Sequence, residues 1–173
     1  MTNFKEELVN IKAFIFDLDG VLSLQTIILN SFGVPNRTVN LRDGYALQLA
    51  VKKGYRVAVI TGSNCKEYSK RLKLLGVSDI YLNSQTKIVH FNSFLKKHGL
   101  KTAEVLFMGD DIPDFEVMKL AGVPVCPADA DSEIKQISLY ISDKKGGEGC
   151  VRDIIEQVLR LHNKWMDFEA FSW

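Results

Sequence analysis

The chain has 173 residues, of which 22 are basic and 21 acidic, so its net charge is +1. It contains neither a basic run that would indicate nucleic-acid binding nor an apolar stretch near the roughly 20 residues that span a bilayer. We therefore expect one domain over residues 1–173 with a sizeable core, acting on a small molecule and binding neither nucleic acid nor a membrane.

The first strongly patterned segment is an apolar run at residues 12–17, which ends in Asp17-Leu18-Asp19-Gly20. The run predicts a buried strand, and a glycine after it permits a tight turn. Side chains alternate between the faces of a strand, so Asp17 and Asp19 share one side only while the strand continues. At the edge of the strand, with Gly20 in a tight turn, both carboxylates can converge on one small volume. Two close carboxylates repel each other, and oxygen ligands favour Mg²⁺ over zinc. The motif predicts a magnesium site, although an ordinary polar turn has the same letters.

Residues 22–42 interrupt the otherwise regular pattern of the chain. Two β-rich pieces, 26–29 and 37–41, flank a turn-rich segment at 30–36. This pattern predicts a β-hairpin that projects directly after the aspartate pair. No insertion is long enough to form a lid domain, so we expect a site without a cap domain.

The rest of the chain alternates apolar runs with helical periodicity. Strands are predicted at 12–17, 56–60, 79–82, 105–108, 123–126 and 138–141. Helices are predicted at 43–53, 64–75, 87–98, 113–120, 131–136 and 148–162. This order predicts a three-layer α/β/α, Rossmann-like parallel sheet, in which ligands bind beyond the carboxyl ends of the strands.

Three further motifs follow predicted strands and carry groups that bind phosphate or metal ions. They are Thr61-Gly62-Ser63, Lys87 and Gly109-Asp110-Asp111-x-x-Asp114. A hydroxyl with backbone N–H groups at a strand-to-helix turn favours an anion. Taken singly, the motifs have ordinary explanations as a turn, a solvated helix charge and a helix cap. In this order along one sheet edge, they predict a single site for a phosphate and a metal ion.

The final segment, 163–173, contains two tryptophans and two phenylalanines. Chain ends that fray seldom carry so much apolar area. We therefore expect this aromatic tail to dock on its own or on a neighbouring subunit, and its deletion to weaken assembly or turnover.

The three cysteines, Cys65, Cys126 and Cys150, are widely spaced and form no metal-ligand pair. An odd number of cysteines with this spacing fits a reducing compartment. The amino terminus has no signal-peptide layout. The sequence therefore favours a cytoplasmic protein.

The ordered motifs resemble the four motifs of the haloacid dehalogenase superfamily over nearly the whole chain. Within it, the missing cap, the Arg42-Asp43-Gly44 motif and the glycine-rich loop after Lys145 resemble the tetrameric phosphatases of 3-deoxy-D-manno-octulosonate 8-phosphate (KDO 8-phosphate). The resemblance implies a Mg²⁺-dependent phosphoric monoester hydrolase, a homotetramer that releases KDO for lipopolysaccharide synthesis.

The resemblance and the chemistry of the residues imply the same roles. Asp17 is expected to attack phosphorus and form an aspartyl-phosphate, while Asp19 protonates the leaving alcohol and later activates water. Mg²⁺ is expected to bind Asp17, the backbone carbonyl of Asp19 and Asp110. The groups expected to hold the phosphoryl oxygens are Thr61, Gly62, Ser63 and Lys87.

Two other acidic residues are expected to act indirectly. Asp111 and Asp114 are expected to orient metal-bound waters or Lys87. A plain position in the first turn of a helix explains Asp114 equally well.

The resemblance also implies contacts to the sugar acid, with candidates Arg42, Asp43, Gly44, Arg71 and Lys145. Arg71 matches a family arginine that holds the sugar carboxylate across a subunit interface, and a guanidinium binds a carboxylate through two hydrogen bonds. A solvated helix position is the ordinary explanation of the same arginine.

Two departures from the family pattern concern the substrate. Ser23-Leu24-Gln25 stands where the family has Thr-Asp-Gly, and Ser63 stands where it has arginine, or glutamate in a nine-carbon variant. The alternative substrate is therefore a nine-carbon acid phosphate such as KDN 9-phosphate. Alternatives of other classes are a catalytically idle assembly module and a response-regulator-like phosphoacceptor. An idle module need not retain all four of Asp17, Asp19, Lys87 and Asp110.

Overall fold

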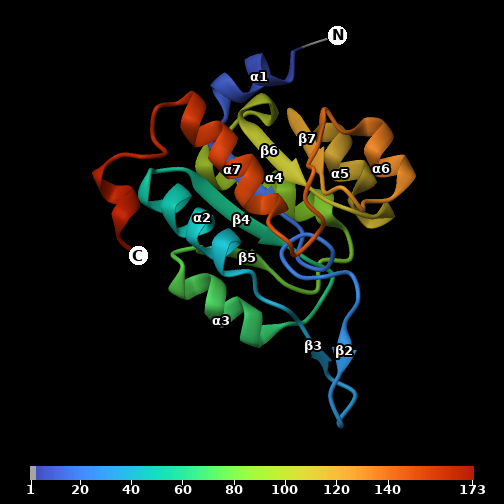
Figure 1. Ribbon diagram of the computed structural model, residues 1–173. Helices are drawn as coiled ribbons and strands as arrows, with labels where there is room; N and C mark the ends of the chain where they lie inside the picture. The colour runs from blue at the N-terminus through green and yellow to red at the C-terminus, as the bar shows by residue number, and fades with distance from the viewer. Residues whose placement is uncertain (1–2) are drawn as a thin grey trace.

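The computed structural model describes residues 3–173, so residues 1 and 2 of the predicted domain lie outside the described part. Its centre is a six-stranded sheet with strand order β5-β4-β1-β6-β7-β8, in which every pair is parallel (Figure 1). The strands are β1 Ala13–Phe16, β4 Arg56–Ile60, β5 Asp79–Tyr81, β6 Val105–Met108, β7 Val123–Cys126 and β8 Tyr140–Ile141. The predicted parallel α/β fold is confirmed.

Strand β1 lies in the middle of the sheet and positions the first motif. All four of its residues are buried, with Phe14 and Phe16 in one core cluster and Ala13 and Ile15 in the other. Such a strand is apolar throughout because both faces of a parallel sheet are covered. Pairing with β4 and β6 brings the carboxyl ends of three strands side by side.

Helices cover both faces of the sheet. One core cluster includes residues of α2 Leu41–Lys52, α3 Lys66–Leu74 and α7 Cys150–Leu161. The other includes residues of α4 Lys87–His98, α5 Phe115–Leu120 and α6 Ser132–Ile137. Shorter helices are α1 Phe4–Glu7 and the 3₁₀ turns η1 Leu8–Asn10, η2 Thr102–Glu104, η3 Ile112–Asp114 and η4 Phe168–Phe171. Over residues 3–173, none of the helices has the length and apolarity to cross a membrane.

The projecting hairpin is present, but the predicted position of its second strand is wrong. The paired strands are β2 Ile28–Leu29 and β3 Pro35–Asn36 (Figure 1). The Asn30 side chain accepts hydrogen bonds from two backbone N–H groups in the turn, which starts the pairing early. Farther along, the N–H of Thr38 donates to Ser23 Oγ at 3.0 Å. This contact holds that segment against the loop after β1 instead of against β2.

The aromatic tail lies on α2 of its own subunit, and the chain end is beside that helix (Figure 1). Trp165 is buried, and Lys53 forms ion pairs with Asp167 and Glu169. The Tyr45 hydroxyl donates a hydrogen bond to the carbonyl of Ala170. Three further aromatic side chains stay exposed, namely Phe168, Phe171 and Trp173.

Candidate active site

A cavity of about 570 Å³ opens at the carboxyl ends of the central strands. It brings together all the residues for which a catalytic, metal-binding, phosphate-binding or orienting role was predicted. These residues are Asp17, Asp19, Thr61, Gly62, Ser63, Lys87, Asp110, Asp111 and Asp114. Segments that are nearly 100 residues apart in the chain therefore meet at one edge of the sheet, as parallel pairing requires.

A lysine between two carboxylates forms the buried centre of the cavity. Lys87, the first residue of α4, places Nζ 2.9 Å from Asp17 Oδ1 and 2.6 Å from Asp114 Oδ1. Burial alone would lower the pKa of Lys87, but the charges of the two carboxylates outweigh it and raise that pKa. Burial, together with the neighbouring charge of Asp114, raises the pKa of Asp17 to about 8. The cationic amine is thus fixed beside the expected nucleophile.

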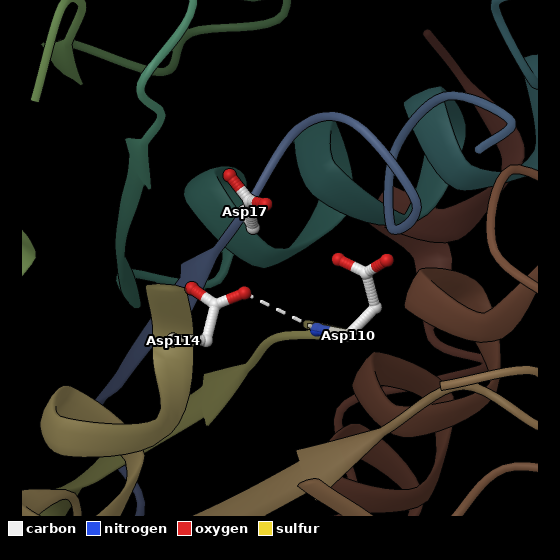
Figure 2. A group of neighbouring side chains, drawn as sticks. All are labelled: Asp17, Asp110 and Asp114. Atoms are coloured by element: carbon white, nitrogen blue, oxygen red, sulfur yellow. Dashed lines mark hydrogen bonds between the residues drawn. The ribbon is translucent and has the colours of Figure 1, made fainter. Parts of the chain in front are cut away.

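Three buried carboxylates face a common space from β1, β6 and η3 (Figure 2). One oxygen of each of Asp17, Asp110 and Asp114 lies within 4.8 Å of the others. Within the described part of the chain, Asp110 Oδ1 is buried without a hydrogen-bond partner, and burial raises the pKa of Asp110 to about 7. A buried, unpartnered carboxylate oxygen is costly unless a cation meets it. The all-oxygen donor set fits Mg²⁺, which when bound would neutralise charge on a phosphoryl group.

Asp114 holds Asp110 and Lys87 in place, and Lys87 in turn pairs with Asp17. Its Oδ1 accepts from Lys87 Nζ, and its Oδ2 accepts from the backbone N–H of Asp110 at 3.2 Å (Figure 2). Both of its oxygens are therefore engaged by the protein. This arrangement is consistent with the predicted orienting role and leaves Asp17 and Asp110 as the side chains that would hold Mg²⁺.

Glycine at position 20 is required by a close approach of backbone to carboxylate. Gly20 has φ +84°, and a Cβ built there would lie 1.9 Å from Asp110 Oδ2. The loop after β1 can therefore pass beside the second acidic motif only without a side chain at this position. The glycine of the first motif thus brings the two acidic motifs together.

The expected phosphate cradle lies at the end of β4. The N–H of Ser63 donates to Thr61 Oγ1 at 3.1 Å, so this N–H is already engaged within the turn. The Thr61 hydroxyl keeps its own proton for an anion, and the Gly62 backbone lines the same cavity. Ser84, which was not predicted, also lines it, and its buried hydroxyl has no hydrogen-bond partner among the residues that the structure describes. A phosphoryl oxygen is a ligand that would satisfy that hydroxyl.

Asp19 is bound by an arginine that the sequence analysis did not identify. Arg37 donates from Nε to Asp19 Oδ1 at 2.7 Å and from Nη2 to Oδ2 at 2.9 Å. Ser63 Oγ donates to Asp19 Oδ2 at 2.6 Å, and Arg37 Nη2 also donates to Ser63 Oγ at 2.9 Å. Arg37 lies on the hairpin, and no motif or spacing distinguishes it from a solvated arginine.

Gln25, noted only as a departure from the family pattern, also reaches Asp110, one of the carboxylates expected to bind the metal ion. Its Nε2 donates to Asp110 Oδ2 at 3.1 Å and to the backbone carbonyl of Asp129 at 3.3 Å. Asp129 and Asp131, which the sequence analysis did not single out, line the same cavity. The Gln25 amide thus holds Asp110 Oδ2, whereas the other oxygen, Oδ1, accepts from no described residue.

None of the five residues proposed to contact the sugar acid lines this cavity. The predicted Arg42-Asp43-Gly44 turn is instead the first turn of α2, because the Asn40 side chain caps that helix. Asp43 is buried and accepts from the backbone N–H of Arg152 at 2.7 Å. The remaining candidates lie outside the cavity: Arg71 lines a second cavity between the hairpin and α3, and Lys145 is exposed.

The raised carboxyl pKa values predict how stability depends on pH in the metal-free protein. Asp17 and Asp110 have pKa values of about 8 and about 7 in the folded protein, against 3.8 for an unperturbed aspartate. Between these values the folded state holds protons that the unfolded chain has released. The free energy of unfolding should therefore fall as pH rises from about 5 to 8.

Mg²⁺ should reverse part of this loss because it binds the ionised carboxylates and displaces their protons. Thermal melts across this pH range, in chelator and in Mg²⁺, measure both effects. The stabilisation by Mg²⁺ should increase with pH. Metal-free stability that rises through the window would contradict the assigned burial of the two carboxyl groups.

Residues 76–154 match the family model described as haloacid dehalogenase-like hydrolase. The curated 3-deoxy-D-manno-octulosonate 8-phosphate phosphatase KdsC of Escherichia coli (strain K12) is 33% identical over 155 residues, covering 90% of this chain and 82% of that protein. The phosphatase of the same name from Yersinia pestis has a crystal structure with a TM-score of 0.90 and 30% identity, over 93% of this chain and 87% of that one.

A structure of the Moraxella catarrhalis phosphatase of the same name contains magnesium ion, phosphate ion and KDO. It matches with a TM-score of 0.89 and 32% identity, over 97% of this chain and 95% of that one. These similarities extend over nearly all of this chain.

Proposed function

The chain belongs to the family of 3-deoxy-D-manno-octulosonate 8-phosphate phosphatases, which are haloacid dehalogenase-like hydrolases, and on this basis we propose that it hydrolyses KDO 8-phosphate to KDO and phosphate with Mg²⁺. The observation that carries this proposal is the cavity in which Asp17, Lys87 and Asp110 meet, with Asp19 at its edge. An idle module would not need buried like charges beside an unpartnered carboxylate oxygen.

Catalysis begins with attack of the Asp17 carboxylate on phosphorus. The phosphorus–oxygen bond of the ester breaks, and Asp19 donates a proton to the leaving oxygen. In the second step Asp19 takes a proton from water, whose oxygen attacks the aspartyl-phosphate and releases inorganic phosphate. Splitting the hydrolysis in this way replaces one difficult step with two easier ones.

Fixed donors around the phosphoryl group supply the electrostatic part of catalysis. Lys87 is held by Asp114 at 2.6 Å and points its ammonium group at the cavity. The hydroxyls of Thr61 and Ser84 face the same space. Donors that are in place before the reaction stabilise developing charge without reorganising. Asp17 and Asp110 would hold Mg²⁺, which when bound would offer positive charge to the phosphoryl oxygens.

Phosphate release from a panel of esters tests the proposal. KDO 8-phosphate, KDN 9-phosphate and a neutral hexose 6-phosphate would be compared in Mg²⁺ and in chelator. The highest kcat/KM is expected for KDO 8-phosphate, with activity lost in chelator. A preference for the nine-carbon acid would retain the chemistry and change the substrate. No release from any ester by the Mg²⁺-loaded protein would support an assembly module.

The intact protein is proposed to be a cytoplasmic homotetramer that acts in lipopolysaccharide synthesis. The exposed aromatic side chains of the tail, Phe168, Phe171 and Trp173, support assembly because buried apolar area stabilises association. The three cysteines are buried and free, which suits a reducing compartment.

Deleting residues 165–173 is expected to dissociate the tetramer and to lower the melting temperature, because Trp165 packs on its own subunit. The double substitution Phe168→Ser and Phe171→Ser, which keeps Trp165, should dissociate the tetramer with little change in melting temperature. Light scattering and thermal melts measure the two effects. A deletion variant that remained a fully active tetramer would contradict the role given to the tail.

A further inference from the structure

Every oxygen of the Asp19 carboxylate is occupied in this structure. Arg37 and Ser63 place three N–H or O–H donors on its two oxygens, at 2.7, 2.9 and 2.6 Å. Among residues 3–173, Arg37 is the only donor to Oδ1, whereas Arg37 and Ser63 share Oδ2. Both oxygens of Asp19 therefore already accept from protein donors, and Oδ1 loses its protein donor only when Arg37 moves.

Arg37 also lies at the boundary between two cavities. Asp19 and Ser63, its two partners, line the cavity that holds the nucleophile. Arg37 itself lines a second cavity of about 580 Å³ between the hairpin and α3. A phosphate ester bound at Asp17 must direct its leaving group past Asp19. The leaving group then meets Arg37 at the entrance to the second cavity.

The pairing of Arg37 with Asp19 is the pairing that a guanidinium makes with any carboxylate. Two parallel N–H groups bind the two oxygens of one planar anion. The Arg37 side chain is only 11% exposed, so moving it away from Asp19 without a new anion leaves a charge poorly solvated. A carboxylate on the substrate supplies that anion, and a neutral sugar does not.

We propose that Arg37 determines specificity by exchanging the Asp19 carboxylate for the carboxylate of a sugar-acid phosphate, an inference that rests on the proposed function. The exchange keeps one ion pair in place of another, so it costs little for an acidic substrate. It frees Asp19 Oδ1, while the Ser63 hydroxyl still holds Oδ2 and keeps the carboxyl group oriented. Esters without a carboxylate leave Asp19 bound to Arg37 and react slowly. Arg37 is thus a recognition group that also releases a catalytic one.

Two variants of Arg37 and one matched control test the exchange. Arg37→Met removes the guanidinium, and Arg37→Lys keeps the charge but loses the two parallel N–H groups. Arg56→Met removes an exposed arginine at the opposite end of the sheet, at the start of β4. Each protein, loaded with Mg²⁺, would be assayed on KDO 8-phosphate and on ribose 5-phosphate, which has no carboxylate.

Arg37→Met is expected to lower kcat/KM for KDO 8-phosphate about 10²-fold, as for loss of a buried charged partner. The same variant should leave kcat/KM for ribose 5-phosphate unchanged or raise it. Inhibition by free KDO should weaken about tenfold or more, while inhibition by inorganic phosphate stays the same. The kcat/KM of Arg37→Lys for KDO 8-phosphate should lie between the values of Arg37→Met and the wild type. Arg56→Met should have the kcat/KM of the wild type.

A fall by the same factor on both substrates would overturn the exchange and reduce Arg37 to a structural contact of the hairpin, because partial unfolding lowers both rates equally. Unchanged inhibition by KDO in Arg37→Met would overturn it as well. If the wild type releases no phosphate from KDO 8-phosphate, the proposed function fails and the exchange fails with it. The two kinds of failure can be told apart. Failure of the proposed function is seen in the wild type, whereas failure of the exchange alone is seen only in Arg37→Met.

Discussion

Replacing Asp17 with asparagine is expected to lower kcat on the order of 10⁴- to 10⁶-fold, as removal of a covalent nucleophile does in other hydrolases. The amide cannot form the aspartyl-phosphate, and it also offers Mg²⁺ a weaker ligand. Because burial raises the pKa of Asp17 to about 8, the neutral asparagine resembles the protonated side chain of the metal-free protein near pH 7. Metal-free stability should therefore not fall.

Phosphate release and thermal melts in chelator measure the two parts of this expectation. Asp143→Asn is the matched control, because it makes the same change at an exposed carboxylate outside the catalytic cavity. It should keep the activity of the wild type. An Asp17→Asn protein with more than about a hundredth of the wild-type rate would show that another group attacks phosphorus.

Replacing Lys87 with methionine is expected to reduce both turnover and stability. Loss of the cation that faces the phosphoryl group should lower kcat by about 10²- to 10³-fold. Asp17 and Asp114 would remain buried without their shared partner, which lies 2.9 and 2.6 Å from them. Breaking such a buried pair costs about 3 to 5 kcal/mol in free energy of unfolding, although protonation of the carboxyls offsets a part.

Mg²⁺ should stabilise Lys87→Met more than the wild type, because a cation that repels the metal has been removed while the carboxylates remain. Denaturant unfolding with and without Mg²⁺ gives the two differences. Lys96→Met, at an exposed position of the same helix, should show neither effect. Equal stabilisation of variant and wild type by Mg²⁺ would mean that Lys87 does not act on the metal-binding carboxylates.

The sequence predicts the bounds of three inner strands and one helix. Those predicted for β4, β6 and β7 match the structure, and so do those of α4, whereas β1 is one residue shorter at each end than predicted. Long apolar runs and helical periodicity carry this information locally. The sequence also predicts that the acidic motifs meet at one edge of the sheet, because parallel strands bring their carboxyl ends together.

The features that the sequence could not reveal depend on contacts between distant side chains and backbone. The second hairpin strand was misplaced because Asn30 and Ser23 bind backbone N–H groups, which no periodicity records. Arg37 reaches Asp19 across 18 residues and has no motif of its own. Ser84 gains its place from the turn after β5, since its N–H donates to the carbonyl of Thr61.

The glycines that allow loops to touch have a consequence for how this enzyme can evolve. A Cβ at Gly146 would lie 1.9 Å from the carbonyl oxygen of Gly20, just as one at Gly20 would meet Asp110. The loop at Gly146 thus meets the backbone of the loop after β1, and that loop meets the Asp110 side chain, so a side chain at either glycine would separate them. The hairpin tip has no such restriction, since a Cβ at Gly33 would meet nothing within 4 Å. Inherited variation in this lineage should therefore accumulate on the hairpin, beside Arg37, while the edge that holds the nucleophile stays fixed.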